Sequence, residues 1–124
     1  MKTSFKELKE AQPALLRILS APMDVKLAYR LSKIASKIDS QFKAIEKQRR
    51  ELINQYGEKK DDAIRVPDKR MPEFEKDWNI FMEKEFDLDI QLIPWEVIEI
   101  SGVKLSPMDL TILEKFIEMP EKLR

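Results

Sequence analysis

The chain contains neither cysteine nor histidine, and only two glycines occur among its 124 residues. Without these residues there is no disulfide framework, no thiol nucleophile, no Ser-His-Asp triad and no zinc site built on Cys or His. Two glycines cannot form the glycine-rich loops that hold phosphates in nucleotide-binding proteins. Carboxylates, hydroxyls, lysine and arginine remain for chemistry. We therefore predict a protein that is not an enzyme and that uses no cofactor and no metal.

Long apolar runs are also missing. No run approaches the roughly 20 residues that span a bilayer, and the opening residues MKTSFKELKE carry charges where a signal peptide would be apolar. We expect a soluble cytoplasmic protein with no membrane partner. Hydrophobic residues make up 43% of the chain, which is enough to build one core, and we predict a single domain over residues 1–124.

The first part of the domain, residues 1–57, should contain two helices. Ser4 and Glu7 have the spacing of a capping box in front of apolar residues at helical intervals up to Leu19. Because proline lacks an N–H and clashes with the preceding turn, Pro13 predicts a kink or two short helices meeting near Gln12.

The clearest pattern runs from Asp24 to Tyr56 and predicts one long helix of about 50 Å. Its seam, with steps of three or four residues, is Leu27, Leu31, Ile34, Ile38, Phe42, Ile45, Arg49, Leu52 and Tyr56. Gly57 is expected to end the helix in the left-handed conformation.

Residues 58–71 have few apolar side chains and are interpreted as a solvated loop, and Pro72 should open the third helix. We expect this helix to fold back along the distal half of the long helix. The first helix should cover the proximal half. The long helix then forms the centre of a helical hairpin.

The last part, residues 72–124, should add a small β element. Phe86 to Leu92 alternates apolar and polar residues, and Trp95 to Ile100 is rich in β-forming residues, so together they predict a two-stranded antiparallel ribbon. Ser106 is a capping residue before a short C-terminal helix. The predicted fold class is mostly α with this small β element.

Charge is distributed unevenly along the chain. Residues 1–60 hold 14 Lys and Arg against 7 Asp and Glu, whereas residues 61–124 hold 9 against 16. At about 100° per residue, one stripe of the long helix carries Lys26, Arg30, Lys33 and Lys37. These four residues are candidates for binding nucleic acid or another anion. The alternative, which we favour, is a solvated face whose charges are balanced by the acidic half of the same chain.

Phe42, Ile45 and Arg49 form a candidate interaction surface. A helix this long, flanked by shorter ones, should leave apolar surface near Phe42 and Ile45, which predicts a homo-oligomer and most simply a dimer. Arg49 lies on the apolar seam, where a guanidinium needs a partner, and we expect it to pair with Glu75 or Asp77 of the third helix rather than with a ligand.

Two further clusters have structural explanations. Four carboxylates at positions 83, 85, 87 and 89 could hold Mg²⁺ or Ca²⁺, but no calcium-binding loop follows them, and a charged outer face is the favoured interpretation. An aromatic group that we expect to belong to the core consists of Phe74, Trp78, Phe81, Phe86 and Trp95.

The stretch LAYRLSKIASKIDSQFKAIEKQRRELINQYGEKKDD, followed by FDLDIQL and LSPMDLTILEKF, resembles small uncharacterised proteins encoded by bacteriophages and prophages. Those proteins look like long helical hairpins followed by a short strand pair and a last helix. The resemblance contains no catalytic motif. It implies a viral accessory or structural protein in the cytoplasm of a bacterial host cell.

Three hypotheses about function follow. The first is a non-enzymatic interaction or assembly module that self-associates and binds a host or phage protein. The second is a nucleic-acid or nucleotide-binding accessory protein that uses the basic stripe. A metal-dependent hydrolase that uses the acidic residues between positions 83 and 89 ranks last.

Overall fold

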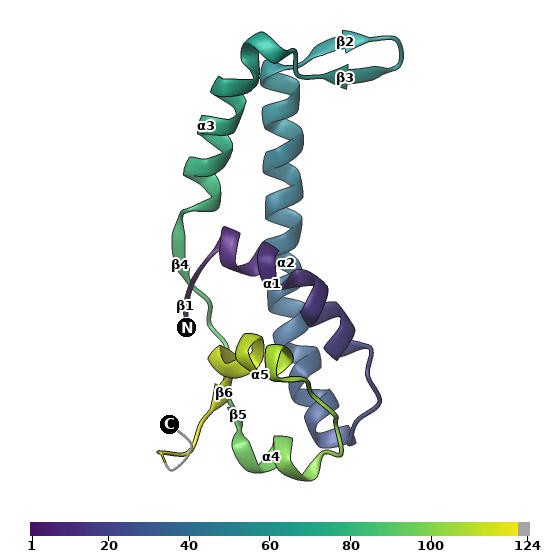
Figure 1. Cartoon of the computed structure of the whole chain (residues 1–124), viewed down its shortest axis with the longest axis vertical. Coiled ribbons are helices and arrows are strands. Elements are labelled where there is room, and N and C mark those ends of the chain that lie inside the picture. Colours follow the sequence, from purple (N-terminus) through teal and green to yellow (C-terminus); the bar gives the residue numbers. More distant parts are fainter. Residues whose placement is uncertain (122–124) are drawn as a thin grey trace.

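The computed structural model describes residues 1–121, and the long helix α2 (Val25–Tyr56) runs through most of the length of the molecule (Figure 1). Helix α3 (Met71–Met82) lies beside the distal half of α2. Helices α1 (Phe5–Leu19), α4 (Trp95–Ile100) and α5 (Pro107–Leu113) surround its proximal half. The predicted class, mostly α with a small β element, is confirmed.

Three short strand pairs complete the described part of the chain. β1 (Lys2–Ser4) pairs with β4 (Glu85–Asp87), and β2 (Glu58–Lys60) pairs with β3 (Ala63–Arg65), both antiparallel. β5 (Ile93–Pro94) pairs in parallel with β6 (Ile117–Glu118). Short 3-10 turns cover Asp68–Arg70 and Glu114–Phe116. Below, the stalk means residues 43–82 and the body means residues 1–42 together with residues 83–121.

The long helix forms as predicted, but its end has a different cause. Asp24 caps the first turn by accepting a hydrogen bond from the Lys26 N–H at 2.9 Å. Gly57 follows the last turn with φ −84° and ψ 158°, so the expected left-handed conformation is wrong. A Cβ at this position would lie 2.3 Å from the Ile53 carbonyl oxygen and 2.5 Å from a methyl group of Ile64. Glycine is therefore needed for space and not for its backbone conformation.

Helix α1 starts at the predicted cap, where the Ser4 hydroxyl accepts a hydrogen bond from the Glu7 N–H at 3.1 Å. The helix continues through Pro13, so a division into two helices near Gln12 does not occur. Pro13 lies on the exposed side of α1. Buried side chains before and after it, Leu8, Ala14, Leu15 and Ile18, keep one helix packed on the protein. Tertiary packing thus outweighs the local cost of the proline.

The body contains the main hydrophobic core, which collects side chains from α1, α2, α4 and the last turns of the chain. Helices α1 and α2 contribute six of its buried residues. The buried members are Leu15, Ile18, Leu27, Leu31, Ile34, Ile38, Leu88, Ile93, Val97, Ile98, Leu113, Phe116 and Ile117. The predicted packing of the first helix on the proximal half of α2 is confirmed.

The stalk is a hairpin of two helices. Its buried hydrophobic residues are Ile45, Leu52 and Tyr56 on α2 and Met82 at the end of α3. The hydroxyl of Tyr56 donates a hydrogen bond to the Asp77 carboxylate across the two helices. The prediction that the third helix folds back along the distal half of the long helix is confirmed.

The predicted ribbon between residues 86–92 and 95–100 is wrong. Residues Glu85–Asp87 pair with the N-terminal strand, in a register that places Thr3 opposite Phe86, and Trp95–Ile100 forms helix α4. The alternation did identify an extended segment, because Leu88 is 3% exposed while Asp87 and Asp89 face solvent. A period of two shows which side of a segment is buried but not which strand pairs with it.

The supposed loop at residues 58–71 contains the hairpin β2–β3, which projects from the end of the stalk (Figure 1). Asp61 occupies its turn with φ 55°, a conformation that aspartate tolerates better than most residues. All six paired residues are exposed, including the apolar Ala63 and Ile64. The hairpin is held by its backbone ladder and carries no core of its own.

The C-terminal helix α5 begins with the predicted cap. The Ser106 hydroxyl accepts from the Asp109 N–H at 3.1 Å, and the Asp109 carboxylate accepts from the Ser106 N–H at 3.3 Å. Asp109 is also bound by the guanidinium of Arg17 on α1. Asp109 thus stabilises the first turn of α5 and also connects α5 to α1.

None of the helices within residues 1–121 combines the length and the apolar character that crossing a membrane requires.

Candidate functional site

Three of the four predicted basic residues line one groove on the body. The groove has a volume of about 310 Å³ and is bordered by α2 and by the extended segment that precedes β5. Its residues, called the basic groove below, are Arg30, Lys33, Ile34, Lys37, Ile90 and Gln91. Lys26 lies one turn earlier on the same side of α2 and is exposed, but it does not line the groove.

The charges of this groove are unevenly balanced. Lys37 Nζ lies 3.7 Å from the Asp89 carboxylate and also donates to the Asp89 carbonyl oxygen. Lys33 Nζ lies over the ring of Tyr29, 4.8 Å from its centroid. Within residues 1–121, neither Arg30 nor Lys33 has a carboxylate in ion-pair distance, and the same holds for Lys26. Balance by the chain's own acidic half therefore applies to Lys37 but not to its three neighbours.

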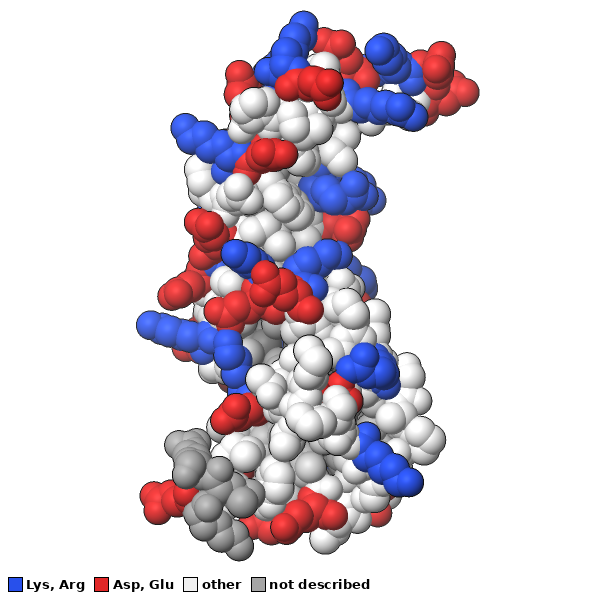
Figure 2. Space-filling view, viewed as in Figure 1, with Lys and Arg blue, Asp and Glu red and all other residues white. Residues whose placement is uncertain are grey.

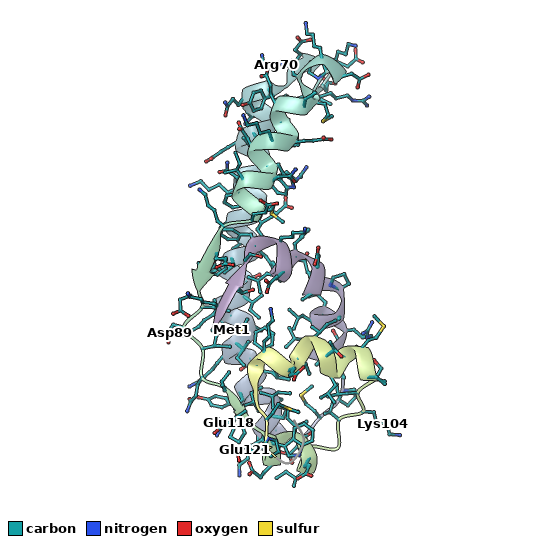
Figure 3. All side chains as sticks on the ribbon, turned by 60° about the vertical axis from the view of Figure 1, so that its left-hand side comes forward. Met1, Arg70, Asp89, Lys104, Glu118 and Glu121 are labelled. Atoms are coloured by element: carbon teal, nitrogen blue, oxygen red, sulfur yellow. The ribbon has the colours of Figure 1, made fainter. Side chains whose placement is uncertain are left out.

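Two of the four carboxylates between positions 83 and 89 form ion pairs within the fold. Asp87 binds the N-terminal amino group of Met1 at 2.9 Å, and Asp89 pairs with Lys37. Figure 3 shows Met1 and Asp89 on adjoining segments at one side of the molecule. In the described residues there is no group of three or more potential ligands placed to hold a metal ion.

A second groove runs between α1 and α2 and is mostly apolar. One section of about 390 Å³ is lined by Leu15, Leu16, Leu19, Ser32, Ala35, Ser36, Ile38, Asp39 and Phe42. An adjoining section of about 260 Å³ is lined by Leu19, Ala21, Met23, Ala28, Leu31, Ser32 and Ala35. The two sections share three residues, so they are treated together as the α1–α2 groove.

The α2 side of this groove continues into an uncharged helix face formed by Val25, Ala28, Tyr29, Ser32, Ala35 and Ser36. Val25 is 80% exposed and Tyr29 is 61% exposed, and across the groove Leu16 is 55% exposed. Figure 2 shows charges of both signs over the stalk, whereas the part of the body over α5 and the end of α1 is largely white, with a few charged side chains at its edges. In a chain with 37% charged residues, such a face needs an explanation.

The three residues predicted for an interaction surface do not share one exposed face. Ile45 is 1% exposed inside the stalk, and Phe42 is half-buried in the α1–α2 groove. Arg49 is exposed and pairs with Glu46 of its own helix at 3.3 Å, so the expected pairing with Glu75 or Asp77 is wrong. Ile45 and Leu52 are buried, while Arg49 between them faces solvent, since an unpaired charge is more stable in water than in a protein interior. The exposure of Leu16 and Leu19 could not be predicted, because nothing in the sequence shows which part of α1 stays uncovered.

Two charged contacts join α1 to the C-terminal part of the body. Hydrogen bonding to Lys115 lowers the pKa of Glu7, which also accepts from the Thr3 hydroxyl at 3.3 Å. The guanidinium of Arg17 lowers the pKa of Asp109 in the same way. Both carboxylates thus connect α1 to the C-terminal part of the body.

The aromatic residues divide between the two regions. Phe5 of α1 stacks on Phe81 with ring centroids 4.4 Å apart, and it also contacts Phe86 at 4.7 Å. Trp78 lies 6.1 Å from Phe81, whereas Trp95 packs on the main core of the body. Three members of the expected aromatic group, Trp78, Phe81 and Phe86, are thus connected by ring contacts, and Phe5 joins them from a distant part of the sequence.

Comparisons of the chain with protein-family models, curated proteins and solved structures found no match. The resemblance to phage-encoded proteins therefore stays a prediction from the sequence.

Proposed function

We propose that this chain is a non-enzymatic assembly module of phage type that acts in the cytoplasm of a bacterial host. Its first partner is a second copy of the same chain, and the resulting homodimer binds a host or phage protein. The observation that carries the proposal is the α1–α2 groove with its adjoining uncharged face on α2. A solvated helix face in a highly charged chain would be expected to carry charges.

The shape of this face supports pairing with a copy of itself. A two-fold interface uses the same patch twice, so it needs projections and hollows on one surface. If two α2 helices pack antiparallel around Ser32, the projecting Tyr29 of one copy lies opposite the small Ala35 of the other. In that register Ala28 faces Ser36, and these small side chains allow the two helices to approach closely.

Charge does not oppose this association. The chain has 23 basic and 23 acidic residues, so two copies have no net repulsion at neutral pH. The nearest charges on the groove side are also of limited effect, since Asp39 is already paired with Lys43 at 3.2 Å. The uncharged face is thus bordered by this ion pair and by Lys33, whose ammonium lies over the ring of Tyr29.

Sedimentation and light scattering at tens of micromolar test the proposal. We expect a particle of about twice 14.7 kDa for the parent chain. A double variant, Leu16→Glu with Tyr29→Glu, should be monomeric because it places charges on both sides of the groove. The matched control is Ile80→Glu, a change at a side chain that is 54% exposed on the stalk.

The control variant should keep the dimer. A monomeric parent, or a control that dissociates as readily as the double variant, would contradict the proposal. Circular dichroism of the three proteins checks that each is folded.

The alternative function is a nucleic-acid or nucleotide-binding accessory protein. The basic groove is the observation that favours it, since Arg30 and Lys33 face solvent without acidic partners in the described residues. The experiment in the next section separates this alternative from protein binding.

A further inference from the structure

The basic groove already binds one acidic residue of its own chain. Lys37 interacts with both the carboxylate and the backbone carbonyl of Asp89, which belongs to the segment between β4 and β5. Lys37 thus shows how this groove can bind an aspartate of a neighbouring segment.

The positive charges of Arg30 and Lys33 indicate that the groove can bind further acidic side chains. Arg30 is half-buried and Lys33 is exposed. Both lie on the same side of α2 as Lys37, Lys33 one turn away from it and Arg30 two turns away. Gln91 occupies the position of the extended segment that borders this part of the groove. Because glutamine is neutral, the segment leaves the two cations without an acidic partner.

We propose that the basic groove binds an extended peptide segment with alternating acidic side chains, supplied by a partner protein. The juxtaposition that carries the proposal is Arg30 and Lys33 on α2 beside the apolar floor made by Ile34 and Ile90. The basic groove adjoins the self-association face, since the Lys33 ammonium lies over the Tyr29 ring, but peptide binding in the groove needs no second copy of the chain.

The dimensions of the groove match such a segment. Arg30 and Lys37 are separated by about 10 Å along α2, at 1.5 Å per residue. In an extended chain, side chains two residues apart share a face and repeat at about 7 Å. Two carboxylates at this spacing can both reach cations of the groove, while the apolar stems of Arg30 and Lys33 and the two isoleucines accept the aliphatic part of the ligand.

Local charge favours an acidic peptide over a nucleic acid. The exposed carboxylate of Asp89, next to Ile90 in the chain, lies beside the groove and would repel a long polyanion that extended past Lys37. Tyr29 supplies one ring for stacking, but it already lies beneath the Lys33 ammonium. A short ligand with two or three charges avoids the acidic end of the groove.

Fluorescence polarisation with a labelled peptide containing Glu-Val-Asp-Val-Glu tests the proposal. The first control probe is the same peptide with Gln-Val-Asn-Val-Gln, and the second is short single-stranded and duplex DNA. The protein variants are Arg30→Gln with Lys33→Gln and, as a control, Lys47→Gln with Arg50→Gln. The control removes equal charge from exposed positions of the same helix outside the groove.

We expect the parent to bind the acidic peptide and not the amide peptide. The groove variant should lose at least about tenfold in affinity, and the control should stay within about twofold. Equal binding of the amide peptide, an equal loss in both variants, or no binding of the acidic peptide would overturn the proposal. DNA binding that is tighter than peptide binding and is lost in the groove variant would also overturn it, in favour of the nucleic-acid alternative. Dimerisation is measured separately for each variant, so that a loss of peptide binding is distinguished from a loss of the dimer.

Discussion

The body and the stalk are built on the same helix but are stabilised differently. In the body, α2 is surrounded by segments from both ends of the chain, and its seam residues Leu27 and Leu31 are 1% and 4% exposed. In the stalk, α2 has one helical partner, and the distal hairpin adds a backbone ladder without buried side chains. The contrast shows that one amphipathic helix can be part of a multilayer core at one end and of a simple hairpin at the other. Local stability should therefore be lower in the stalk.

Two tryptophans make this comparison measurable. Trp78 belongs to the stalk and contacts Phe81, while Trp95 packs on the core of the body. A Trp95→Phe protein therefore reports on the stalk, and a Trp78→Phe protein reports on the body. The predictions below use these two proteins as the background.

The largest expected effect comes from a charge in the body core. Leu31→Asp places an unpaired carboxylate at a site that is 4% exposed, and it should reduce the free energy of unfolding by more than about 4 kcal/mol. We expect loss of the folded signal from Trp95 and of most helical circular dichroism.

The matched change in the stalk is Leu52→Asp, at a site that is 3% exposed. We expect it to alter the Trp78 signal while the Trp95 signal and its melting temperature stay close to those of the parent. If Leu52→Asp unfolds both reporters together, body and stalk form one cooperative unit and the comparison fails.

A smaller effect separates the two regions by pH. The pKa of Asp109 is lowered from its ordinary value of 3.8 by Arg17, and the pKa of Glu7 is lowered from 4.5 by Lys115. Between the unfolded and folded pKa values the unfolded chain binds more protons, so the body should lose stability as pH falls below about 4.5. In the stalk, hydrogen bonding to Asp77 raises the pKa of Tyr56 above 10.0. That contribution is complete below pH 10.0 and should be lost as pH rises through the folded pKa.

Denaturant titrations across pH, followed by each tryptophan, check these directions. Asp109→Asn should flatten the acid limb of the Trp95 curve, and Tyr56→Phe should flatten the alkaline limb of the Trp78 curve. Identical pH profiles for the two reporters would show that the contacts do not act regionally.

The smallest effect is expected at Arg49. Because its pair with Glu46 is exposed, Arg49→Gln should change the free energy of unfolding by less than about 0.5 kcal/mol. The Trp78 unfolding curve measures this change. A loss of several kcal/mol would instead indicate the buried ion pair that the sequence suggested.

Much of the fold could be predicted because its signals are local. Helix caps such as Asp24 and Ser106 act within one turn, and the apolar residues of each helix are spaced by three or four positions. The helices that these signals indicate are present. The basic groove was partly predictable for the same reason, since Arg30, Lys33 and Lys37 share one side of a helix whatever surrounds it. The position of Gln91 opposite them was not, because it depends on where a distant extended segment crosses α2.

By itself, the sequence determined the helices α1, α2, α3 and α5 and most of their buried stripes, since periodicity and capping act within a few residues. It did not determine α4, because the pattern of Trp95–Ile100 indicated a strand. Tertiary structure decided the partners. Residues Glu85–Asp87 pair with the N-terminal strand rather than with Trp95–Ile100, Arg49 turns to solvent, and Phe5 joins Phe81 and Phe86. Such choices compare the free energies of whole packing arrangements. No local pattern records which distant backbone edge, carboxylate or ring will be within reach once the chain is folded.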